Sequence, residues 1–399
     1  MSDFSLHDFR SYENAVVKLD PGISVFVGEN GQGKTNLLEA VGYLSTFSSH
    51  RVGNDGALIR QGKSAGVIRA KTVSGQTQKI IELEIVAGKA NRARINRGNV
   101  NVGSLRGIIK TVLFAPEDLS LVKGDPKERR KFLDLLIIQL KPGYAAVCGE
   151  YEKVLRQRAA LLKNAGKMRR RGLSFDEKTL DVWDLQLARL GARMIFARAE
   201  ATAALRRYIQ TFYRELSGTE QDVRITYEAS LYRQRGGDSA GEETLPGSPE
   251  EENGLPDTAR TEREMLETLR LFHEREILRG VNLVGPHRDD LCLFLGTLPV
   301  KGYASHGESW SYALALKLAS WKVLQENEDN IWDENTQPIL LLDDVFAELD
   351  AGRRIRLAEI VSGAQQVLIT AAVGDDLPAS LEGNRFFVTK GAVEKIDVG

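Results

Sequence analysis

A glycine-rich segment near the start of the chain combines the residue types that hold a polyphosphate. Gly28-Glu29-Asn30-Gly31-Gln32-Gly33-Lys34-Thr35 matches G-x-x-x-x-G-K-[ST] at every fixed position. Its glycines let backbone N–H groups approach phosphate oxygens, and the helix expected after them points its positive end at the same anion. We expect Lys34 to reach the β- and γ-phosphates of ATP and the Thr35 hydroxyl to bind Mg²⁺. The strand-like run SVFV before the segment and the helix formers after it support a nucleotide site here.

Two carboxylates follow an apolar run far along the chain. Ile339-Leu340-Leu341-Leu342-Asp343-Asp344 predicts a buried strand that delivers its acids at the carboxyl-terminal edge of a sheet, where the second half of a phosphate-loop site belongs. We expect Asp343 to hold Mg²⁺ through water and Asp344 to polarise the attacking water as general base. Asp344 and Lys34 are therefore the predicted catalytic residues.

The distance between the two motifs favours one class of ATPase. Asp343 lies 309 positions after Lys34, whereas a simple kinase or small GTPase would bring them closer; this separation is typical of the ABC/SMC group. Ala347-Glu348-Leu349-Asp350 fits the D-loop of that group. Ala304-Ser305-His306-Gly307-Glu308 fits its signature segment, which binds the γ-phosphate held by the opposite subunit. One phosphate loop and one signature per chain predict an ATP-dependent homodimer, with Ser305 and Gly307 of the signature at the nucleotide of the opposite subunit.

Strand patterns occur at both ends of the chain and helical patterns lie between them. Apolar stripes at helical spacing predict three helices between residues 124 and 217 and a fourth near 260–278. Alternating or continuous apolar runs predict strands over residues 1–27, 67–102, 281–285 (VNLVG), 289–295 (DDLCLFL), 338–344, 365–372 and 385–390.

This layout predicts an α/β fold, a P-loop ATPase head of the ABC/SMC type with an inserted helical lobe. The head would be built from an N-terminal half at residues 1–122 and a C-terminal half at 281–399, with the lobe at 123–280. Within the lobe, residues 236–259 carry seven acidic residues and no Lys or Arg, and are rich in Gly, Pro and Ser. We expect a disordered, solvated acidic loop there.

Charge is unevenly distributed along the 399 residues. The formal net charge is −1, yet residues 123–217 contain 21 Lys and Arg against 11 Asp and Glu. Such a basic region favours contact with the phosphates of a nucleic acid, and no base-reading motif accompanies it.

Composition also bears on the compartment. Cys148 and Cys292 are too few for a disulfide framework, and we expect buried thiols in a reducing environment. The N-terminus has no signal-peptide pattern, and no apolar run approaches the roughly 18 residues of a membrane helix. We therefore expect a soluble cytoplasmic protein without a membrane partner.

Several separated motifs resemble those of the RecF family. They are Asn30 to Asn36, the opening Phe9-Arg10-x-Tyr12, Pro116 to Asp134, Leu283 to Asp290, and LLLDDVFAELD, in the family's order. The resemblance runs from residue 4 to about 390, and it implies that Arg10 and Asn36 join the nucleotide-binding residues. It implies a weak DNA-stimulated ATPase that binds single- and double-stranded DNA and dimerises on ATP. With RecO- and RecR-type partners, such a mediator would promote RecA loading at gaps in DNA repair, replication restart and the SOS response.

The sequence departs from the family pattern in two places. Glu308-Ser309-Trp310-Ser311 stands where the family usually carries Gln-Gln-Arg-Thr after the signature glycine, and the acidic loop is an extra insertion. The chain also lacks a zinc hook and a long coiled coil, so it resembles a short-armed relative of the SMC proteins.

Two other classes share part of these motifs. The energy-coupling subunit of a membrane transporter would have the same phosphate loop, signature and D-loop, but the wide motif separation and the basic lobe disfavour it. In a small-molecule phosphotransferase, Asp344 would activate a substrate hydroxyl, but the sequence contains no substrate-lid or pocket pattern.

Overall fold

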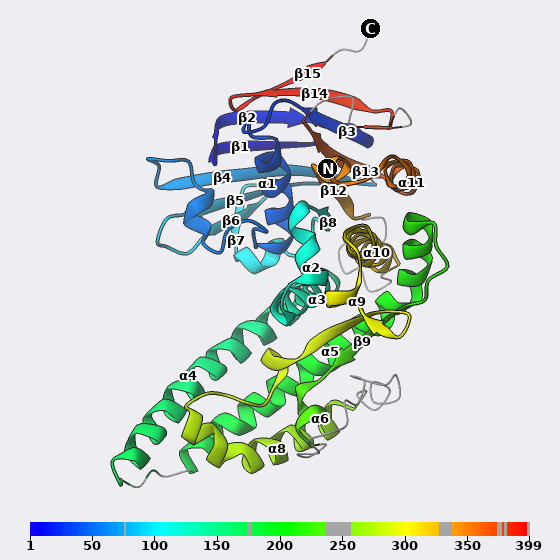
Figure 1. The fold of residues 1–399 in the computed structure, drawn as a ribbon. Coiled ribbons are helices and arrows are strands. Elements are labelled where there is room, and N and C mark those ends of the chain that lie inside the picture. The colour runs from blue at the N-terminus through cyan, green and yellow to red at the C-terminus, as the bar shows by residue number, and fades with distance from the viewer. Residues whose placement is uncertain are drawn as a thin grey trace.

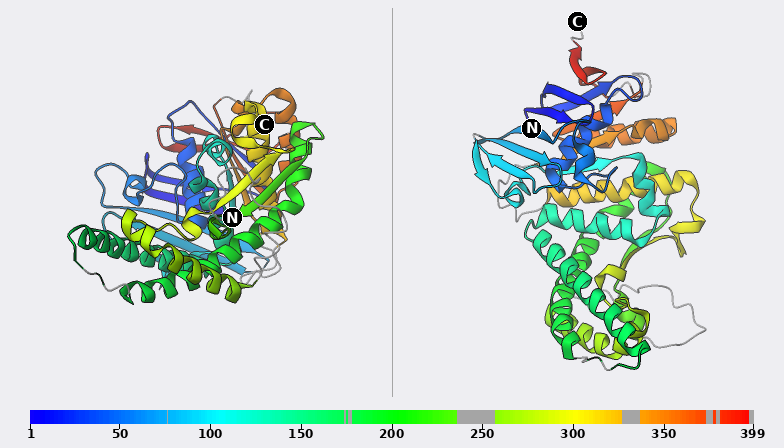
Figure 2. Two further views of the ribbon diagram at one scale, coloured as in Figure 1. Left: turned by 60° about the horizontal axis from the view of Figure 1, so that its bottom comes forward. Right: turned by 90° about the vertical axis from the view of Figure 1, so that its left-hand side faces the viewer.

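The computed structural model consists of a β-rich head and a helical lobe that projects from it (Figures 1 and 2). It describes residues 1–75, 77–173, 175, 178–235, 257–326, 337–372, 377–378 and 381–396. Most of the predicted acidic loop, residues 236–256, therefore lies outside the described residues. The first and last strands of the chain both belong to the head.

A six-stranded sheet at the centre of the head joins the two ends of the chain. Its spatial order is β15 (Ala392–Ile396), β14 (Asn384–Thr389), β3 (Gly22–Val27), β13 (Gln366–Ala371), β12 (Ile339–Asp343) and β8 (Thr111–Phe114). The five strands from β14 to β8 are parallel to their neighbours, and β15 is antiparallel to β14. The predicted head sheet, built from N- and C-terminal segments, is confirmed.

Both faces of this sheet are covered, which explains why its strands are apolar without alternation. Leu340 and Leu342 pack into the core shared with the lobe helices, whereas Leu341 packs into the core around α1 (Lys34–Thr46). All four apolar residues of β12 are buried, and the strand ends at Asp343. The sheet thus delivers its acid at the carboxyl-terminal edge.

A second, antiparallel sheet covers the other side of α1. Its spatial order is β2 (Tyr12–Lys18), β1 (Asp3–Phe9), β4 (Ala65–Ser74), β5 (Thr77–Val86), β6 (Arg92–Ile95) and β7 (Gly98–Val100). Phe4, Leu6, Ile68 and Leu83 of this sheet pack in one core with Leu37 and Leu38 of α1. The helix that follows the phosphate loop is therefore held between two sheets.

Four long helices build most of the lobe and match the predicted stripes. They are α3 (Pro126–Leu140), α4 (Tyr144–Arg170), α5 (Lys178–Ser217) and α8 (Thr258–Arg279). The start of α5 lies at the far end of the lobe, where Leu180 packs with Leu162 and Ile277. Its last turns lie in the head, where the rings of Tyr213 and Tyr312 meet edge to face at 5.9 Å. One helix thus spans both parts of the molecule.

A buried cluster of charges fastens the lobe helices together. The Arg158 guanidinium of α4 donates to Asp184 Oδ1 of α5 (2.6 Å), Glu276 Oε2 of α8 (2.6 Å) and Asn282 Oδ1 (2.8 Å). His273 contacts the other oxygen of Asp184. The side chains of Arg158, Asp184 and Glu276 are fully buried. We call these five residues the lobe cluster.

The remaining elements are short or join the two parts. The helices are α2 (Leu119–Lys123), α6 (Ser230–Arg235), α9 (Val300–Tyr303), α10 (His306–Gln325) and α11 (Ala351–Ser362). The 3₁₀ turns are η1 (Asp55–Leu58), η2 (Val102–Leu105), η3 (Pro116–Asp118), η4 (Pro286–Arg288) and η5 (Val345–Glu348). A three-stranded sheet has the order β11 (Leu298–Pro299), β10 (Asp290–Leu295) and β9 (Val223–Glu228).

Two sequence predictions differ from this arrangement. Residues 281–285, predicted as a strand, form none. The predicted strand at 289–295 exists as β10, but it pairs with β9 and β11 in the separate small sheet and not with the head sheet. The division of the chain at residues 122 and 280 stays a prediction, since α5 belongs to both parts.

Cys148 and Cys292 are half-buried free thiols. None of the described helices is long and apolar enough to cross a membrane.

Candidate nucleotide site

The glycine-rich segment forms the turn between β3 and α1. Gly33 is the N-cap of α1 with φ 108°, a conformation that side chains disfavour. A Cβ there would lie 2.8 Å from Ser11 Oγ and 3.0 Å from Tyr12 Oη, whose hydroxyl donates to the Gly33 carbonyl (3.0 Å). At Gly28 a Cβ would lie 2.3 Å from the carbonyl oxygen of Val388. Glycine at these positions lets the loop pack closely and leaves the helix N–H groups free for an anion.

Lys34 lies folded into its own loop. Its side chain is buried, and Nζ donates to the carbonyls of Gly28 (2.6 Å) and Glu29 (3.1 Å) and approaches Asn30 Oδ1 at 3.5 Å. These partners are neutral, so the loop places an ammonium group among carbonyl oxygens at the point where phosphates are expected. Reaching an anion requires only a change of partner by Nζ.

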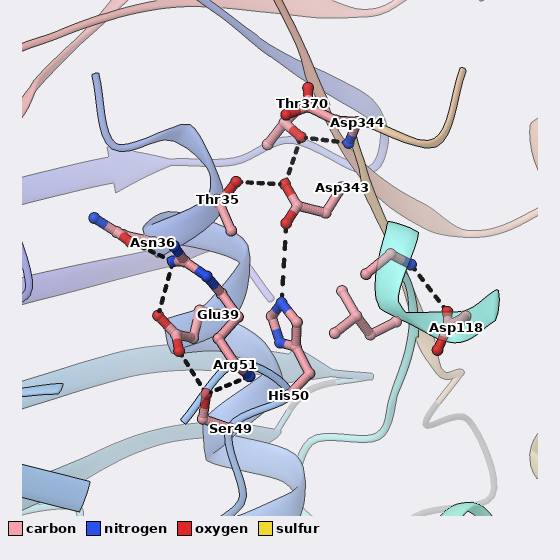
Figure 3. Close-up of polar contacts among 12 residues, drawn as sticks. Thr35, Asn36, Glu39, Ser49, His50, Arg51, Asp118, Asp343, Asp344 and Thr370 are labelled. Atoms are coloured by element: carbon pink, nitrogen blue, oxygen red, sulfur yellow. Dashed lines mark hydrogen bonds and ion pairs between the residues drawn. The ribbon is translucent and has the colours of Figure 1, made fainter. Parts of the chain in front are cut away.

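The two predicted motifs meet at Asp343. Thr35 Oγ1 donates to Asp343 Oδ1 at 2.9 Å although the residues are 308 positions apart, and Thr370 Oγ1 donates to the same oxygen at 2.7 Å (Figure 3). Asp343 of β12 and Thr370 of β13 are the last paired residues of these two neighbouring parallel strands, and this pairing brings their side chains together. The predicted pairing of a metal-binding hydroxyl with a metal-binding carboxylate is thus present as a direct contact.

Because the Asp343 carboxylate is buried, a nearby cation would stabilise its charged form. Burial raises its pKa to about 6, against the lowering effect of the bonds from Thr370 and Thr35; the charges of Asp344 and Glu117 raise it further. His50 Nε2 lies 3.9 Å from Asp343 Oδ2. Burial lowers the pKa of His50 to about 4, so the ring is neutral at pH 7 and does not neutralise the acid.

The donor set fits a hard divalent cation. Hydroxyl and carboxylate oxygens are the ligands that Mg²⁺ takes in phosphate-binding sites, usually with several waters retained. Thr35 and Asp343 offer such oxygens at the first turn of α1, beside the predicted phosphate position. The predicted metal residues are therefore brought together by the fold.

Asp344 leaves the strand in a left-handed turn. Its φ is 51°, and its backbone N–H donates to Thr370 Oγ1 at 2.9 Å. Asp and Asn occupy this region more readily than most side chains. The turn holds Asp344 directly beside Asp343 and Thr370, at the edge where the γ-phosphate side of a nucleotide is expected.

The other loop residues bind neighbouring segments. Gln32 Oε1 accepts the Lys390 N–H (2.8 Å). Asn36 donates to Ser11 Oγ (3.0 Å) and accepts from Arg51 Nη1 (2.9 Å). These contacts fix the loop against both sheets. Gly31 has φ 83° and open space around it, so it forms the exposed crest of the loop.

Arg10 occupies a different environment from the one its predicted role suggests. Its guanidinium donates to both oxygens of Glu39 (2.8 and 2.6 Å) and to the Ala57 carbonyl (2.9 Å). Glu39 is buried in α1; burial raises its pKa, but the Arg10 and Ser49 bonds outweigh that effect and the pKa is lowered overall. The structure ties Arg10 to α1 rather than to the phosphate loop, and its contact with nucleotide stays a prediction.

The predicted signature segment lies outside this cluster. Ser305 is the N-cap of α10, and it exchanges bonds with Glu308 in a capping box: Glu308 N donates to Ser305 Oγ (3.2 Å) and Ser305 N to Glu308 Oε2 (2.7 Å). A Cβ at Gly307 would lie 2.8 Å from Arg353 Nη1 of α11. The residues around Ser305 and Gly307 therefore come from α10 and α11, and none is part of the phosphate loop.

Two residues of the site were missed by the sequence reasoning. Thr370 could have been found, because it lies near the carboxyl end of the apolar run QVLITA, which a parallel sheet places beside the strand of Asp343. His50 follows α1 in a turn with no pattern of its own. Its Nε2 is a buried atom without a hydrogen-bond partner among the described residues.

Comparison with known proteins agrees with the fold and the motifs. Residues 1–380 match the family model of the RecF/RecN/SMC N terminal domain. The chain is 53% identical over 400 residues to the DNA replication and repair protein RecF of Beutenbergia cavernae, covering 99% of both chains. It is 48% identical over 398 residues to that of Streptomyces avermitilis, covering 99% of this chain and 100% of the relative.

Solved structures give the same result at lower identity. A structure of the recombination mediator protein RecF-ATPrS in the RecFOR pathway has a TM-score of 0.83 and 26% identity, covering 99% of this chain and 97% of the other. A structure of RecF-ATP has a TM-score of 0.80 and 26% identity, covering 99% and 98%. An Smc head domain from Pyrococcus furiosus, at 0.53 and 14%, shares the fold alone. The predicted ABC/SMC-type head is confirmed.

Proposed function

The chain belongs to the RecF family, and from this we propose that it is an ATP-dependent, DNA-binding recombination mediator. In this role it binds single- and double-stranded DNA, dimerises with ATP, and with RecR- and RecO-type partners promotes RecA loading at gaps. It serves DNA repair, replication restart and the SOS response in the cytoplasm. The relatives named RecF and the structures described as recombination mediators in the RecFOR pathway support this proposal.

One contact carries the ATPase part of the proposal. The 2.9 Å bond from Thr35 to Asp343 joins the end of the phosphate loop to the end of β12. In a phosphate-loop ATPase these two residues share Mg²⁺, which neutralises charge on the β- and γ-phosphates. The hydroxyl of Thr35 leaves the charge of the buried Asp343 carboxylate uncompensated, which matches a site that binds a cation.

Each remaining residue of the proposed site has one task. The backbone N–H groups from Gly31 to Thr35 bind phosphate oxygens, and Lys34 exchanges its carbonyl partners for the β- and γ-phosphates. Asp344 accepts a proton from the attacking water as general base. ATP hydrolysis is slow and stimulated by DNA, and it resets the DNA-bound dimer.

The DNA-binding part rests on charge. Three arginines of the basic region, Arg129, Arg158 and Arg198, are buried and bonded to acids, so they do not reach DNA. Exposed cations remain along the lobe, and a group of them lies at the end of α4: Lys163, Lys167, Arg169, Arg170 and Arg171. Binding through such cations is electrostatic and independent of sequence, so it weakens steeply with salt.

The position of the signature supports the dimer part of the proposal. Ser305 and Gly307 lie on α10, bonded to Glu308 and beside Arg353, away from their own phosphate loop. A two-fold pair of chains stacked on ATP places this segment on the γ-phosphate of the opposite subunit. Loss of the γ-phosphate on hydrolysis then loosens the pair.

Sedimentation velocity with and without ATP and DNA tests the proposal. Wild-type protein should shift from monomer to dimer with ATP and form a heavier complex with DNA. Ser305→Arg should bind ATP normally and stay monomeric, because it puts a bulky cation into the interface; Ser362→Arg, an exposed serine at the end of α11, is the matched control. A wild-type chain that stays monomeric at saturating ATP and DNA, or a Ser305→Arg chain that hydrolyses ATP normally, contradicts the dimer. A transporter subunit or a metabolite phosphotransferase would show no DNA complex.

A further inference from the structure

The guanidinium of Arg353 lies against the first turns of α10, where the predicted signature is located. Arg353 belongs to the first turn of α11, and its side chain reaches α10, where Nε donates to Ser311 Oγ at 2.9 Å. A Cβ at Gly307 would lie 2.8 Å from Nη1 and 3.0 Å from Nη2. Glycine at position 307 therefore leaves room for a cation directly beside the signature.

Two of the three nitrogens of this guanidinium have partners. Besides the Nε bond to Ser311, Nη1 donates to Asp350, the last residue of the predicted D-loop. Nη2 has no acceptor among the described residues, and it is open to solvent because the side chain is 22% exposed and Nη2 is not one of its buried unpaired atoms. Arginine held in this way can donate to an anionic oxygen that approaches from outside the chain.

The charges around the signature give this cation a purpose. Hydrogen bonds with Ser305 lower the pKa of Glu308, so this acid in the first turn of α10 is ionised at neutral pH. The backbone N–H of Arg353 likewise lowers the pKa of Asp350. Two carboxylates thus lie near a segment expected to bind a phosphate, and like charges repel. The charge of Arg353 opposes both, because it contributes to the lowered pKa of each acid.

We propose that Arg353 binds the γ-phosphate of the ATP held by the opposite subunit, beside Ser305 and Gly307. Nη2 donates to a γ-phosphate oxygen, while Ser311 and Asp350 hold the guanidinium in place. This inference rests on the proposed ATP-dependent dimer. It also gives a task to one residue of the unusual segment Glu308-Ser309-Trp310-Ser311, because the Ser311 hydroxyl orients the cation.

Arg353→Gln tests this proposal by sedimentation velocity over a series of ATP concentrations. The variant lacks the cation, so dimers should require at least about tenfold more ATP than wild type. Binding of fluorescent ATP by the monomer, at low protein concentration, should be unchanged, because Arg353 contacts α10 and Asp350 and not its own phosphate loop. Arg385→Gln, which removes an exposed arginine of β14, should dimerise like wild type.

Arg353→Lys distinguishes binding of the γ-phosphate from packing of α11 on α10. Lysine keeps the cation but loses the bond from Nε to Ser311, so this variant should dimerise at ATP concentrations nearer those of wild type than Arg353→Gln does. Thermal melting without ATP reports any loss of packing in both variants. If Arg353→Lys required as much ATP as Arg353→Gln, Arg353 would only pack the two helices and the proposal would be wrong.

Mixing two variants tests whether Arg353 acts on the nucleotide of the other chain. In a mixed pair of Arg353→Gln and Lys34→Ala, the intact Lys34 of one chain faces the intact Arg353 of the other, so one complete site should form and hydrolysis should exceed that of either variant alone. The double variant mixed with Lys34→Ala is the control and should stay inactive.

The outcomes separate this proposal from the dimer on which it rests. Wild type that stays monomeric at saturating ATP contradicts the dimer and, with it, the role of Arg353. If wild type dimerises, the role of Arg353 alone is overturned when Arg353→Gln dimerises at the same ATP concentration, or when the mixture is no more active than its separate variants.

Discussion

Two buried groups of charged residues in this molecule differ in one respect. In the lobe cluster, Arg158 meets two carboxylates and an amide, and the second oxygen of Glu276 accepts the Leu283 N–H at 2.6 Å. At the nucleotide site, Asp343 receives two hydroxyl bonds and a neutral imidazole at 3.9 Å. Among the residues that the structure describes, the first group contains its own cation, whereas the Asp343 carboxylate forms an ion-pair contact only with the neutral ring of His50. A buried polar group left incomplete by the fold indicates a ligand, and a completed one indicates a structural role.

The largest expected effect comes from removing the loop cation. Lys34→Ala should abolish ATP binding, a loss of about 3 kcal/mol or more, because charge-assisted bonds to the phosphates disappear. Its stability without ATP should change little, since Nζ bonds only neutral groups of its own loop. Fluorescent-nucleotide titration and thermal melting measure both; Lys18→Ala is the control. Undiminished nucleotide affinity in Lys34→Ala would remove the basis of the nucleotide site.

Asp344→Asn should separate binding from hydrolysis. The amide keeps the shape of the side chain but cannot take a proton from water, so turnover should fall by about 10²–10⁴-fold with ATP affinity retained. Single-turnover hydrolysis and sedimentation should then show ATP-bound dimers accumulating. If Asp344→Asn turned over at the wild-type rate while Asp343→Asn did not, the roles of the two acids would be reversed.

A substitution in the lobe cluster should lower the free energy of unfolding and leave nucleotide binding unchanged. Arg158→Met leaves Asp184 and Glu276 buried without their cation, and about 3–5 kcal/mol of unfolding free energy should be lost. Arg156→Met, two residues earlier on the exposed face of α4, should stay within about 0.5 kcal/mol of wild type. Urea unfolding measures both. An equal effect of the two substitutions would show that burial of this cluster does not matter to the fold.

The smallest effect should be a pH dependence at Asp343. Because its pKa is raised to about 6, protonation below that value removes the charge that Mg²⁺ needs, and Mg²⁺-dependent ATP affinity should fall about tenfold per pH unit there. Asp343→Asn should lack this component, and the ratio of the two proteins corrects for titration of ATP itself. Without ligand the sign reverses: a folded-state pKa above the ordinary 3.8 means that stability is lost as pH rises from about 4 to about 6. If the ratio of the ATP affinities of wild type and Asp343→Asn stayed constant across this pH range, the titrating group would not be Asp343.

Local sequence was sufficient for the parts of the fold that repeat a period or a motif. The apolar stripes predicted α3, α4, α5 and α8, because the helical spacing of apolar residues can be recognised without knowing how the helices pack. The run ILLLDD predicted β12 and its acids, since a strand covered on both faces must be apolar throughout. The phosphate loop was found because phosphate binding requires its glycines and Lys34 at a fixed local spacing.

Local sequence did not predict which strands and side chains pair when they lie far apart in the chain. The strand β9 binds β10 across more than 60 residues, so nothing near either strand indicates that they leave the head sheet. Counting charges likewise treated Arg129, Arg158 and Arg198 as surface cations, although each is buried against an acid from a distant segment. His50 reaches the site because the turn after α1 brings its Nε2 to 3.9 Å from Asp343 Oδ2 at the end of β12.

The length of α5 has a mechanical consequence. At 1.5 Å per residue, its 40 residues form a rod about 60 Å long. One end packs in the apolar cluster of Leu180, Leu162 and Ile277, and the other packs against α10, the helix whose N-cap is Ser305. A tilt of about 5° at one end displaces the other by about 5 Å over such a length. A rigid tilt of α5 would therefore couple a displacement at the tip of the lobe to a displacement beside α10.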